Sequence, residues 1–548
     1  MTSDPVARPS SATTAPPSAS PPASIARPAA LAGAATLTSR VLGLVRETVQ
    51  AAVFGAGNDM DAFTVAFRIP NLVRDLFAEG AMSAAFVPTF ARYLTLRGKP
   101  DAWRLGNNVL TALVGVTGTA VLLGVIFARP LVDLYAGDYA QVPGKLELTI
   151  HLTRVMLPFL TLVAVAAAVM GMLNALRHYF VPALAPAAFN VASIVCALAL
   201  APLMPAIGQP PIMSLAIGAL LGGLGQIALQ WPALRAEGYR YRPHLEARDP
   251  GLRQVLLLMG PGTVGLAATQ INLLVTTVLA VGQGTGAVSW LQYGFRVIYL
   301  PIGLFGVSIA TAVLPSISRQ IAESDRAAVR ATITRGIALM LIVNVPATVG
   351  LLLLAEPIVR LLLERGRFLP ADTLATAAAV QLYAVGLVGY SAARIASPVF
   401  YAFGESRVAV AISTAAIVVN LVLSVWLVRG MGFAGLALAT SLAAIVNGAL
   451  SLFALRARVD GIRGRDLGAT FAKVLGASAV MAVAVEATSR GMTALAPGDA
   501  EIVQALRLFV AIGVGVVALA AAGHLLGITE VSAFLLALRR RTRVVFRR

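Results

Sequence analysis

The chain is short of cysteine, histidine and charged residues, and each shortage narrows what it can be. One cysteine, Cys196, among 548 residues excludes an intramolecular disulfide and a cysteine-based metal site. The four histidines show no ligand spacing, so the sequence predicts no bound metal. Only 12% of the residues are charged, where a soluble protein has about a quarter. These shortages argue against a soluble protein and favour a polytopic membrane protein.

Long apolar runs fill most of the chain, which is 58% hydrophobic. Each run is close to the roughly 20 residues that a bilayer-spanning helix needs. Examples are residues 110–128, 155–173, 337–354 and 506–526. We count about fourteen such runs, which predicts an all-α polytopic membrane protein with about fourteen transmembrane helices. The connecting loops are short, and none is long enough for a separate soluble domain.

The net charge is +18, but the distribution of the basic residues indicates membrane topology rather than a nucleic-acid-binding groove. Most Lys and Arg residues lie in alternate loops, for example in residues 92–104 and 235–253. Cytoplasmic loops of membrane proteins carry such an excess, so both termini are predicted to be cytoplasmic. The first residues are rich in Pro, Ser and Ala and lack the apolar core of a signal peptide. We expect them to form a disordered tail.

An internal repeat divides the apolar part of the chain. Residues 67–92, FRIPNLVRDLFAEGAMSAAFVPTFAR, resemble residues 295–319, FRVIYLPIGLFGVSIATAVLPSISR. The second copy begins six predicted helices after the first, so both copies cross the membrane in the same direction. Parallel repeats of this kind indicate two lobes related by an axis along the membrane normal. Chance similarity between two apolar segments is the alternative.

The repeat and the loops predict a division of the chain into two six-helix lobes, two further helices and two tails. The predicted parts are a disordered cytoplasmic tail (1–29), an N-lobe of helices 1–6 (30–236), a C-lobe of helices 7–12 (250–458), helices 13–14 (467–527) and a basic cytoplasmic C-terminus (528–548). Two such lobes would enclose a central cavity, and rocking of one lobe against the other would give alternating access.

Polar stripes run along three of the predicted helices. At 100° per residue, one side of each helix gathers charged or hydrogen-bonding side chains. The stripes hold Ser39, Arg40, Arg46 and Glu47 in helix 1; Asp61, Arg68, Asn71 and Glu79, with Arg74 to one side, in helix 2; and Ser289, Gln292 and Arg296 in helix 8. An Arg at the bilayer centre costs roughly 2.5–3.5 kcal/mol, so the stripes must face the bundle interior.

Two interpretations of these stripes stay open. Carboxylates such as Glu47 can simply neutralise neighbouring arginines and hold the bundle together. Alternatively, the excess of Arg from both lobes makes a cationic cavity for a phosphorylated or otherwise anionic substrate. The guanidinium fork matches phosphate oxygens in pairs, which suits this second interpretation.

Three segments that contain these polar stripes resemble the MurJ (MviN) family of lipid II flippases, within the multidrug/oligosaccharidyl-lipid/polysaccharide exporter superfamily. They are SRVLGLVRE (39–47), FGAGNDMDAFTVAFRIPNLVRDLFAEGAMSAAFVPTFARY (54–93) and VSWLQYGFR (288–296). The resemblance implies a protein of the bacterial cytoplasmic (inner) membrane, not an enzyme. It would move lipid II, the undecaprenyl-pyrophosphate-linked peptidoglycan precursor, to the outer leaflet. Membrane lipids and cell-wall synthesis proteins are the other partners that it implies, and helices 13–14 would form a groove for the lipid tail.

Matched by motif, the substrate-binding residues of the family correspond to Arg40, Arg46, Asp61, Arg74 and Arg296. The remaining members of the stripes are expected to support them: Ser39, Glu47, Arg68, Asn71, Glu79, Ser289 and Gln292. Some relatives bind sodium through Asp ligands, but helix 7 here has no carboxylate. In helix 11, Asn420 is followed one turn later by Ser424. We therefore expect no metal and no cofactor, with transport driven by the membrane potential.

Two other functions remain as alternatives. An exporter of the same fold could carry another polyprenyl-linked glycan or a drug, although a cationic drug calls for a negative cavity rather than this positive one. A membrane enzyme, such as a polyprenyl-phosphate glycosyltransferase, would need acidic metal-binding residues on a sizeable interfacial loop, and no loop here provides them.

Overall fold

The structure is a computed structural model that describes residues 23–74, 82–303, 307–459, 461, 464–498 and 500–528. Every regular element in these ranges is helical, as the apolar runs predict. The first helix begins at Ala23, inside the predicted tail, because an alanine-rich stretch that favours helix follows Pro21 and Pro22. The rest of that tail and the basic C-terminus beyond residue 528 lie outside the described residues.

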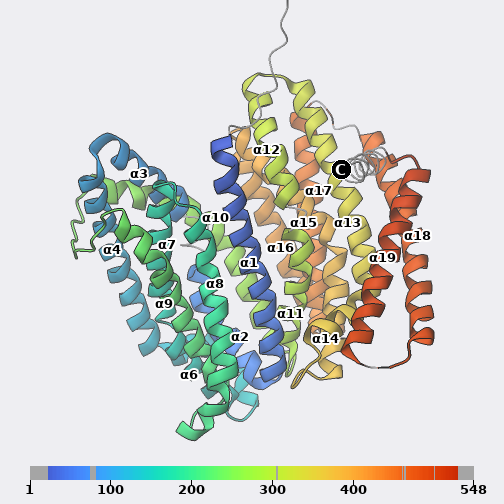
Figure 1. The fold of residues 1–548 in the computed structure, drawn as a ribbon, viewed down its shortest axis with the longest axis horizontal. Helices are drawn as coiled ribbons and strands as arrows, with labels where there is room; N and C mark the ends of the chain where they lie inside the picture. Colours follow the sequence, from blue (N-terminus) through green and yellow to red (C-terminus); the bar gives the residue numbers. More distant parts are fainter. Residues whose placement is uncertain are drawn as a thin grey trace, which may run out of the picture.

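In the described ranges, the first lobe contains nine α-helices and three short 3-10 or π segments. They are α1 (Ala23–Phe54), α2 (Asn58–Arg74), α3 (Met82–Arg97), α4 (Lys99–Ile126), α5 (Ala128–Ala136), η2 (Gly137–Gln141), α6 (Lys145–Met156), α7 (Phe159–Ala175), α8 (Phe180–Val195), η3 (Cys196–Leu200), η4 (Ala201–Ile207) and α9 (Met213–Ala236). Figure 1 shows this lobe on the left, with α1 on the side that faces the second lobe.

The second lobe begins with a long helix that packs against α3 of the first lobe and α16 of the second. Its helices are α10 (Pro250–Val281), α11 (Ala287–Pro301), α12 (Val307–Ala322), α13 (Arg326–Leu363), α14 (Pro370–Val385), α15 (Leu387–Ala402), α16 (Ser406–Met431) and α17 (Phe433–Arg458). The last two helices, α18 (Gly464–Leu495) and α19 (Glu501–Leu525), pack against α13 at the edge of the molecule (Figure 1).

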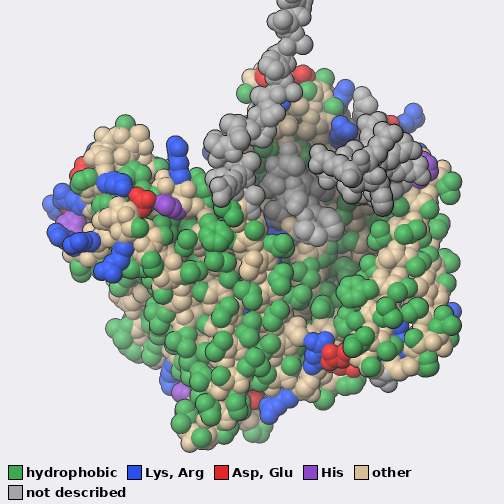
Figure 2. Space-filling view, viewed as in Figure 1, with side chains coloured by type: hydrophobic (Ala, Val, Ile, Leu, Met, Phe, Trp, Pro, Cys, Tyr) green, Lys and Arg blue, Asp and Glu red, His purple; other side chains and the backbone are tan. Residues whose placement is uncertain are grey.

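The molecule is a multi-pass membrane protein. Nine helices in the described ranges are long and apolar enough to cross a bilayer, and the bent pair α14–α15, with 47° between its halves, would make ten. Figure 2 shows hydrophobic side chains covering the middle of the visible face, while Lys and Arg gather near its two ends. The count of about fourteen spans stays a prediction.

The two copies of the repeat have the same local structure. The first copy contains α2 followed by α3, and the second contains α11 followed by α12. Pro88 lies inside α3 and its counterpart Pro315 lies inside α12. Each copy therefore includes the end of one helix and the start of the next, and membrane proteins tolerate a proline inside a helix where neighbours cover the backbone.

The hydrophobic cores show how the lobes meet. One buried cluster joins both lobes and includes Phe54 and Val65 of the first with Val288 and Leu363 of the second. A separate cluster around Phe86 and α7 belongs to the first lobe, together with the start of α10. Another cluster, around Ile333, belongs to the second lobe and its last two helices. The lobes therefore share a core at one end of the molecule and have separate cores at the other.

The end with the shared core is the lower one in Figure 1, and α1 begins at the opposite, upper end. At the upper end, loops that are far apart in sequence lie together. Lys99 pairs with Glu237 at 2.9 Å, and His178 contacts the same carboxylate at 2.8 Å. These hydrogen bonds, with His178 contributing most, lower the pKa of the Glu237 carboxyl. The alternate loops predicted to share one membrane face thus lie on one face.

Cysteines at the two ends of the molecule are expected to react from opposite sides of the membrane. On a Cys196→Ala background, Ser324→Cys places a thiol between α12 and α13, and Thr493→Cys places one near the end of α18; both positions are exposed. A membrane-impermeant maleimide is expected to label one position in intact cells and the other only after the membrane is opened. Equal labelling of both in intact cells would contradict this arrangement.

Candidate functional site

A cavity of about 470 Å³ lies between the first lobe and α11 of the second. Its walls come from α1, α7, α8, α9 and α11, and its charged side chains are Arg40, Arg46, Glu47 and Arg296. The polar stripes of helices 1 and 8 therefore do converge, as helical spacing predicts. Three guanidinium groups face one carboxylate, so the lining is net positive.

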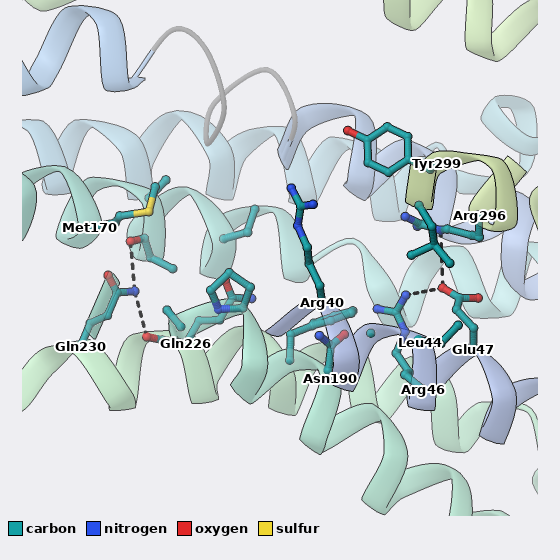
Figure 3. Close-up of a pocket in the computed structure, with 18 residues that line it drawn as sticks. Arg40, Leu44, Arg46, Glu47, Met170, Asn190, Gln226, Gln230, Arg296 and Tyr299 are labelled. Carbon is teal, nitrogen blue, oxygen red and sulfur yellow. Dashed lines mark hydrogen bonds and ion pairs between the residues drawn. The ribbon is translucent and has the colours of Figure 1, made fainter. Parts of the chain in front are cut away.

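Glu47 links the two lobes inside this cavity. Its carboxylate is in contact with the guanidinium of Arg46 on the same helix, and lies 3.5 Å from Nε of Arg296 on α11 (Figure 3). Only about a tenth of the Glu47 side chain is exposed, and the Arg46 guanidinium also stacks over the ring of Phe189, 5.4 Å from its centroid. The neutralising interpretation is thus correct for Glu47, and one carboxylate serves two arginines.

Arg40 extends into the middle of the cavity. It makes no ion pair with any acidic side chain in the described part of the chain, and Figure 3 shows its guanidinium standing clear of the Arg46–Glu47 pair. Its tip lies just beyond the end of α11: a methyl group at Gly303 would be 3.1 Å from Arg40 Nη1. An exposed guanidinium in this place is available to an anion that enters the cavity.

A smaller cavity of about 60 Å³ continues from the charged end of the first toward the shared core. Arg46, Glu47 and Arg296 line both cavities, and the smaller one adds Arg68, Asn71 and Gln292. These three predicted supporting residues therefore lie next to the arginines. Arg68 adds a further positive charge from α2.

Asp61 lies outside both cavities, at the end where the lobes share a core. Its side chain is fully buried and accepts four hydrogen bonds. Oδ1 accepts from the backbone N and Oγ of Ser289, at 3.0 and 2.7 Å, and Oδ2 accepts from Gly286 N and Lys145 Nζ, at 2.7 and 2.9 Å. Because Gly286 and Ser289 begin α11, a carboxylate of the first lobe caps a helix of the second. We call this cluster the Asp61 lock.

Two glycines allow the backbones to meet beside the lock. Arg367 N donates to Ala52 O at 2.9 Å, joining the end of α1 to the loop before α14. Gly366, at φ 58°, lies where a methyl group would be 2.2 Å from Ala52 O. Gly55, at φ 68°, lies where one would be 2.5 Å from Arg367 O. A side chain at either position would push the lobes apart here.

The other predicted residues fall in different places. Ser39 is not part of the cavity lining, although its carbonyl accepts a hydrogen bond of 3.0 Å from Asn190, which does line it. The side chain of Arg74, and Glu79 as a whole, lie outside the described residues.

The position considered for sodium is occupied by a chain of hydrogen bonds between α10 and α16. Asn420 donates to Asn272 at 2.7 Å and accepts from Ser424 at 3.4 Å. In the described ranges, no group of three or more His, Cys, Asp or Glu side chains could hold a metal ion.

The sequence reasoning missed three polar residues. Lys145, only 3% exposed, neutralises Asp61 and lies 4.0 Å from the ring centroid of Tyr139. Gln226 and Gln230 line the far end of the cavity. The signal for Lys145 was its place in the sequence: it lies in a loop where the positive-inside rule disfavours a lysine. For the glutamines it was two polar residues one helical turn apart within an apolar run.

These features define the class: a two-lobed helical membrane transporter with a cationic cavity, closed at one end. The family model for Lipid II flippase MurJ matches residues 50–506. The "Probable lipid II flippase MurJ" of Vibrio cholerae serotype O1 is 35% identical over 429 residues, 77% of this chain and 81% of that one. The "Lipid II flippase MurJ" of Burkholderia cenocepacia is 33% identical over 453 residues, 82% and 87% of the two chains.

Solved structures agree. A lipid II flippase MurJ in an inward closed conformation superposes with a TM-score of 0.75 at 25% identity, covering 90% of this chain and 99% of that one. A multidrug resistance transporter of the MATE family, inward-facing, shares the fold at 15% identity, with a TM-score of 0.66 over 79% and 98% of the chains. The chain belongs to the MurJ family of lipid II flippases.

The Asp61 lock predicts how side-chain changes open this end. Ser289→Ala removes one hydrogen bond to a charged group, worth about 1.5–3 kcal/mol. Lys145→Met leaves a buried carboxylate without its cation, which costs about 3–5 kcal/mol while the lobes are closed. In the open state, water would solvate Asp61. Each substitution therefore destabilises the closed state more than the open state.

The readout is a cysteine at Ala56, a buried position that lies against Gly286 across the lobe boundary. Its labelling by an impermeant maleimide is expected to rise about tenfold or more in Ser289→Ala, and further in Lys145→Met. Arg129→Met, at an exposed ion pair with Glu147 outside the lock, is the matched control and should change nothing. Unchanged labelling in both lock variants would show that the lock does not hold this end closed.

Proposed function

We propose that this protein is a lipid II flippase, which moves the undecaprenyl-pyrophosphate-linked peptidoglycan precursor across the bacterial inner membrane and makes no covalent change in it. The observation that carries the proposal is the convergence of Arg40, Arg46 and Arg296, from both lobes, on one cavity inside a membrane protein. Guanidinium groups bind phosphate oxygens in pairs, and a diphosphate offers several such oxygens.

The cycle begins with the lock closed. The separate cores at the opposite end let the headgroup enter between the lobes from that side. Arg40 meets the diphosphate first, and the diphosphate then competes with Glu47 for Arg46 and Arg296. Since Glu47 joins an α1 arginine to an α11 arginine, this exchange changes what holds the lobes together. Opening of the Asp61 lock would then release the substrate on the other side.

The orientation of the cycle follows from charge. Basic loops predominate at the end where α1 begins, so we place that end and both termini in the cytoplasm, with the lock toward the outer leaflet. The membrane potential is the proposed driving force, because each elementary charge is worth about 2.3 kcal/mol per 100 mV. A negative interior drives the anionic headgroup outward and draws the emptied cationic cavity back.

Export of a cationic drug fits the site poorly. The charged side chains that line the two cavities are four arginines and one carboxylate, and that carboxylate is already shared by two of the arginines. A cation would meet repulsion there, whereas an anion gains attraction in a low-dielectric interior. The sign of the cavity therefore favours a polyprenyl diphosphate over a cationic drug.

The test is rescue of host cells from which this protein has been depleted. Arg40→Ala and Arg296→Ala, produced at normal levels, are each expected to lose most transport, because each removes a paired contact to phosphate worth about 1.5–3 kcal/mol. The measurement is growth together with lipid II accessible at the cell surface. Arg129→Ala, an arginine outside the cavity, should rescue fully.

Rescue by both cavity variants, with normal surface lipid II, would contradict the proposal. Loss of growth with normal surface lipid II would also contradict it, because the essential activity would then be something else. The two measurements are therefore made on the same cultures.

A further inference from the structure

The two ends of the larger cavity differ in the charge of the side chains that line them. Figure 3 shows Arg46, Glu47 and Arg296 at one end, Arg40 in the middle, and Gln226 and Gln230 at the other end. The lining also includes the small side chains of Ala166, Ala167 and Ala185. The far end is thus polar but uncharged, and it has room for groups that are not phosphates.

Gln230 is fixed in place and keeps an unused acceptor. Its Nε2 donates to the carbonyl of Gln226, at 3.0 Å, and more weakly to that of Ala166, at 3.4 Å. The residue is only 1% exposed, and its Oε1 accepts no hydrogen bond from the described residues. A buried acceptor without a donor costs about 1–3 kcal/mol, so a donor that reached it would be bound favourably.

Gln226 supplies the complementary groups. It lies one helical turn before Gln230 on α9 and is partly exposed to the cavity. Its side-chain amide makes no hydrogen bond with a described residue. An amide side chain both donates and accepts, so its best partner is another amide. Met170 lies beside the pair in Figure 3, and its flexible side chain can move to admit a ligand.

We propose that the Gln226–Gln230 end of the cavity is a subsite for neutral secondary amides of the substrate headgroup, while the arginine end takes its diphosphate. The inference rests on the proposed function and deepens it. The shared chemistry is the secondary amide, which occurs both in acetamido groups of the sugars and in peptide bonds. Both side chains contact the ligand in this proposal: the amide of Gln226 donates and accepts, and Oε1 of Gln230 accepts.

The experiment measures Kd for the full chain in lipid nanodiscs with three probes: undecaprenyl diphosphate, lipid II, and lipid II that lacks its peptide. Gln226→Leu is expected to weaken lipid II about 3–10-fold, the loss of one or two neutral hydrogen bonds. The Kd of undecaprenyl diphosphate should change less than about twofold, which also shows that the variant is folded. Gln226→Asn, which keeps an amide, should recover part of the loss.

Gln141→Leu, the same substitution at an exposed position on the outer surface, is the matched control and should leave all three values unchanged. A loss that persists with the peptide-free lipid assigns the amide to the sugars, and a loss that disappears assigns it to the peptide. Both results support the subsite.

Equal Kd values for lipid II in wild type and Gln226→Leu, or equal weakening of lipid II and undecaprenyl diphosphate, would overturn the subsite and leave the proposed function standing. If wild type binds undecaprenyl diphosphate and lipid II no better than phosphatidylglycerol, the proposed function itself fails. The two failures are therefore distinguishable in one set of measurements.

Discussion

The buried carboxylate of Asp61 is the interaction on which the rest of the structure depends. A charge without access to water is tolerated only when it is paired and fully hydrogen-bonded. Asp61 meets this condition with Lys145 from its own lobe and with Gly286 and Ser289 from the other. Because three of its four hydrogen bonds come from the other side of the boundary, the lobes cannot part here without exposing it. The closed end therefore follows from the solvation of one residue.

The closed end gives the cavity its direction. With the lobes joined at the Asp61 lock, their buried clusters are separate at the opposite end, and it is from that end that we propose the substrate enters. Glu47 plays a similar part deeper in, since it holds Arg46 and Arg296 from different lobes. The carboxylates of Glu47 and Asp61 differ in what can separate them from the groups that they bind. An anionic ligand competes for the arginines of Glu47, whereas only movement of α11 or hydration releases Asp61.

Helical phase in the sequence predicts which side chains face inward, and much of the site follows from it. The stripes of helices 1 and 8 place Arg40, Arg46 and Arg296 in one cavity, as the structure has them. Helical phase predicts on which face of a helix a residue lies. It does not predict how deep in the molecule the residue lies or which residue it contacts. Asp61 and Arg68 share a face, yet one lies in the lock and the other beside the cavity, because they are two turns apart along α2.

Residues outside the stripes were beyond this reasoning. Lys145 reaches Asp61 from a part of the chain 84 residues away, and only the packing of α6 against α2 brings them together. Gln226 and Gln230 lie in a helix with no charged stripe, so their one-turn spacing within an apolar run is the sole mark of its cavity face. The all-helical, many-spanning fold was predictable because length and hydropathy alone determine it.

The central claim is that Asp61 holds the two lobes together at the end where they share a core. Its most direct test is the distance between spin labels at Gln141, in the first lobe, and Leu369, in the second, both exposed at this end. The labels are placed on a Cys196→Ala background, with and without Asp61→Ala, and measured by double electron–electron resonance. The account predicts one narrow distribution with Asp61 present and an added, longer distance without it. Identical distributions in the two proteins would contradict it.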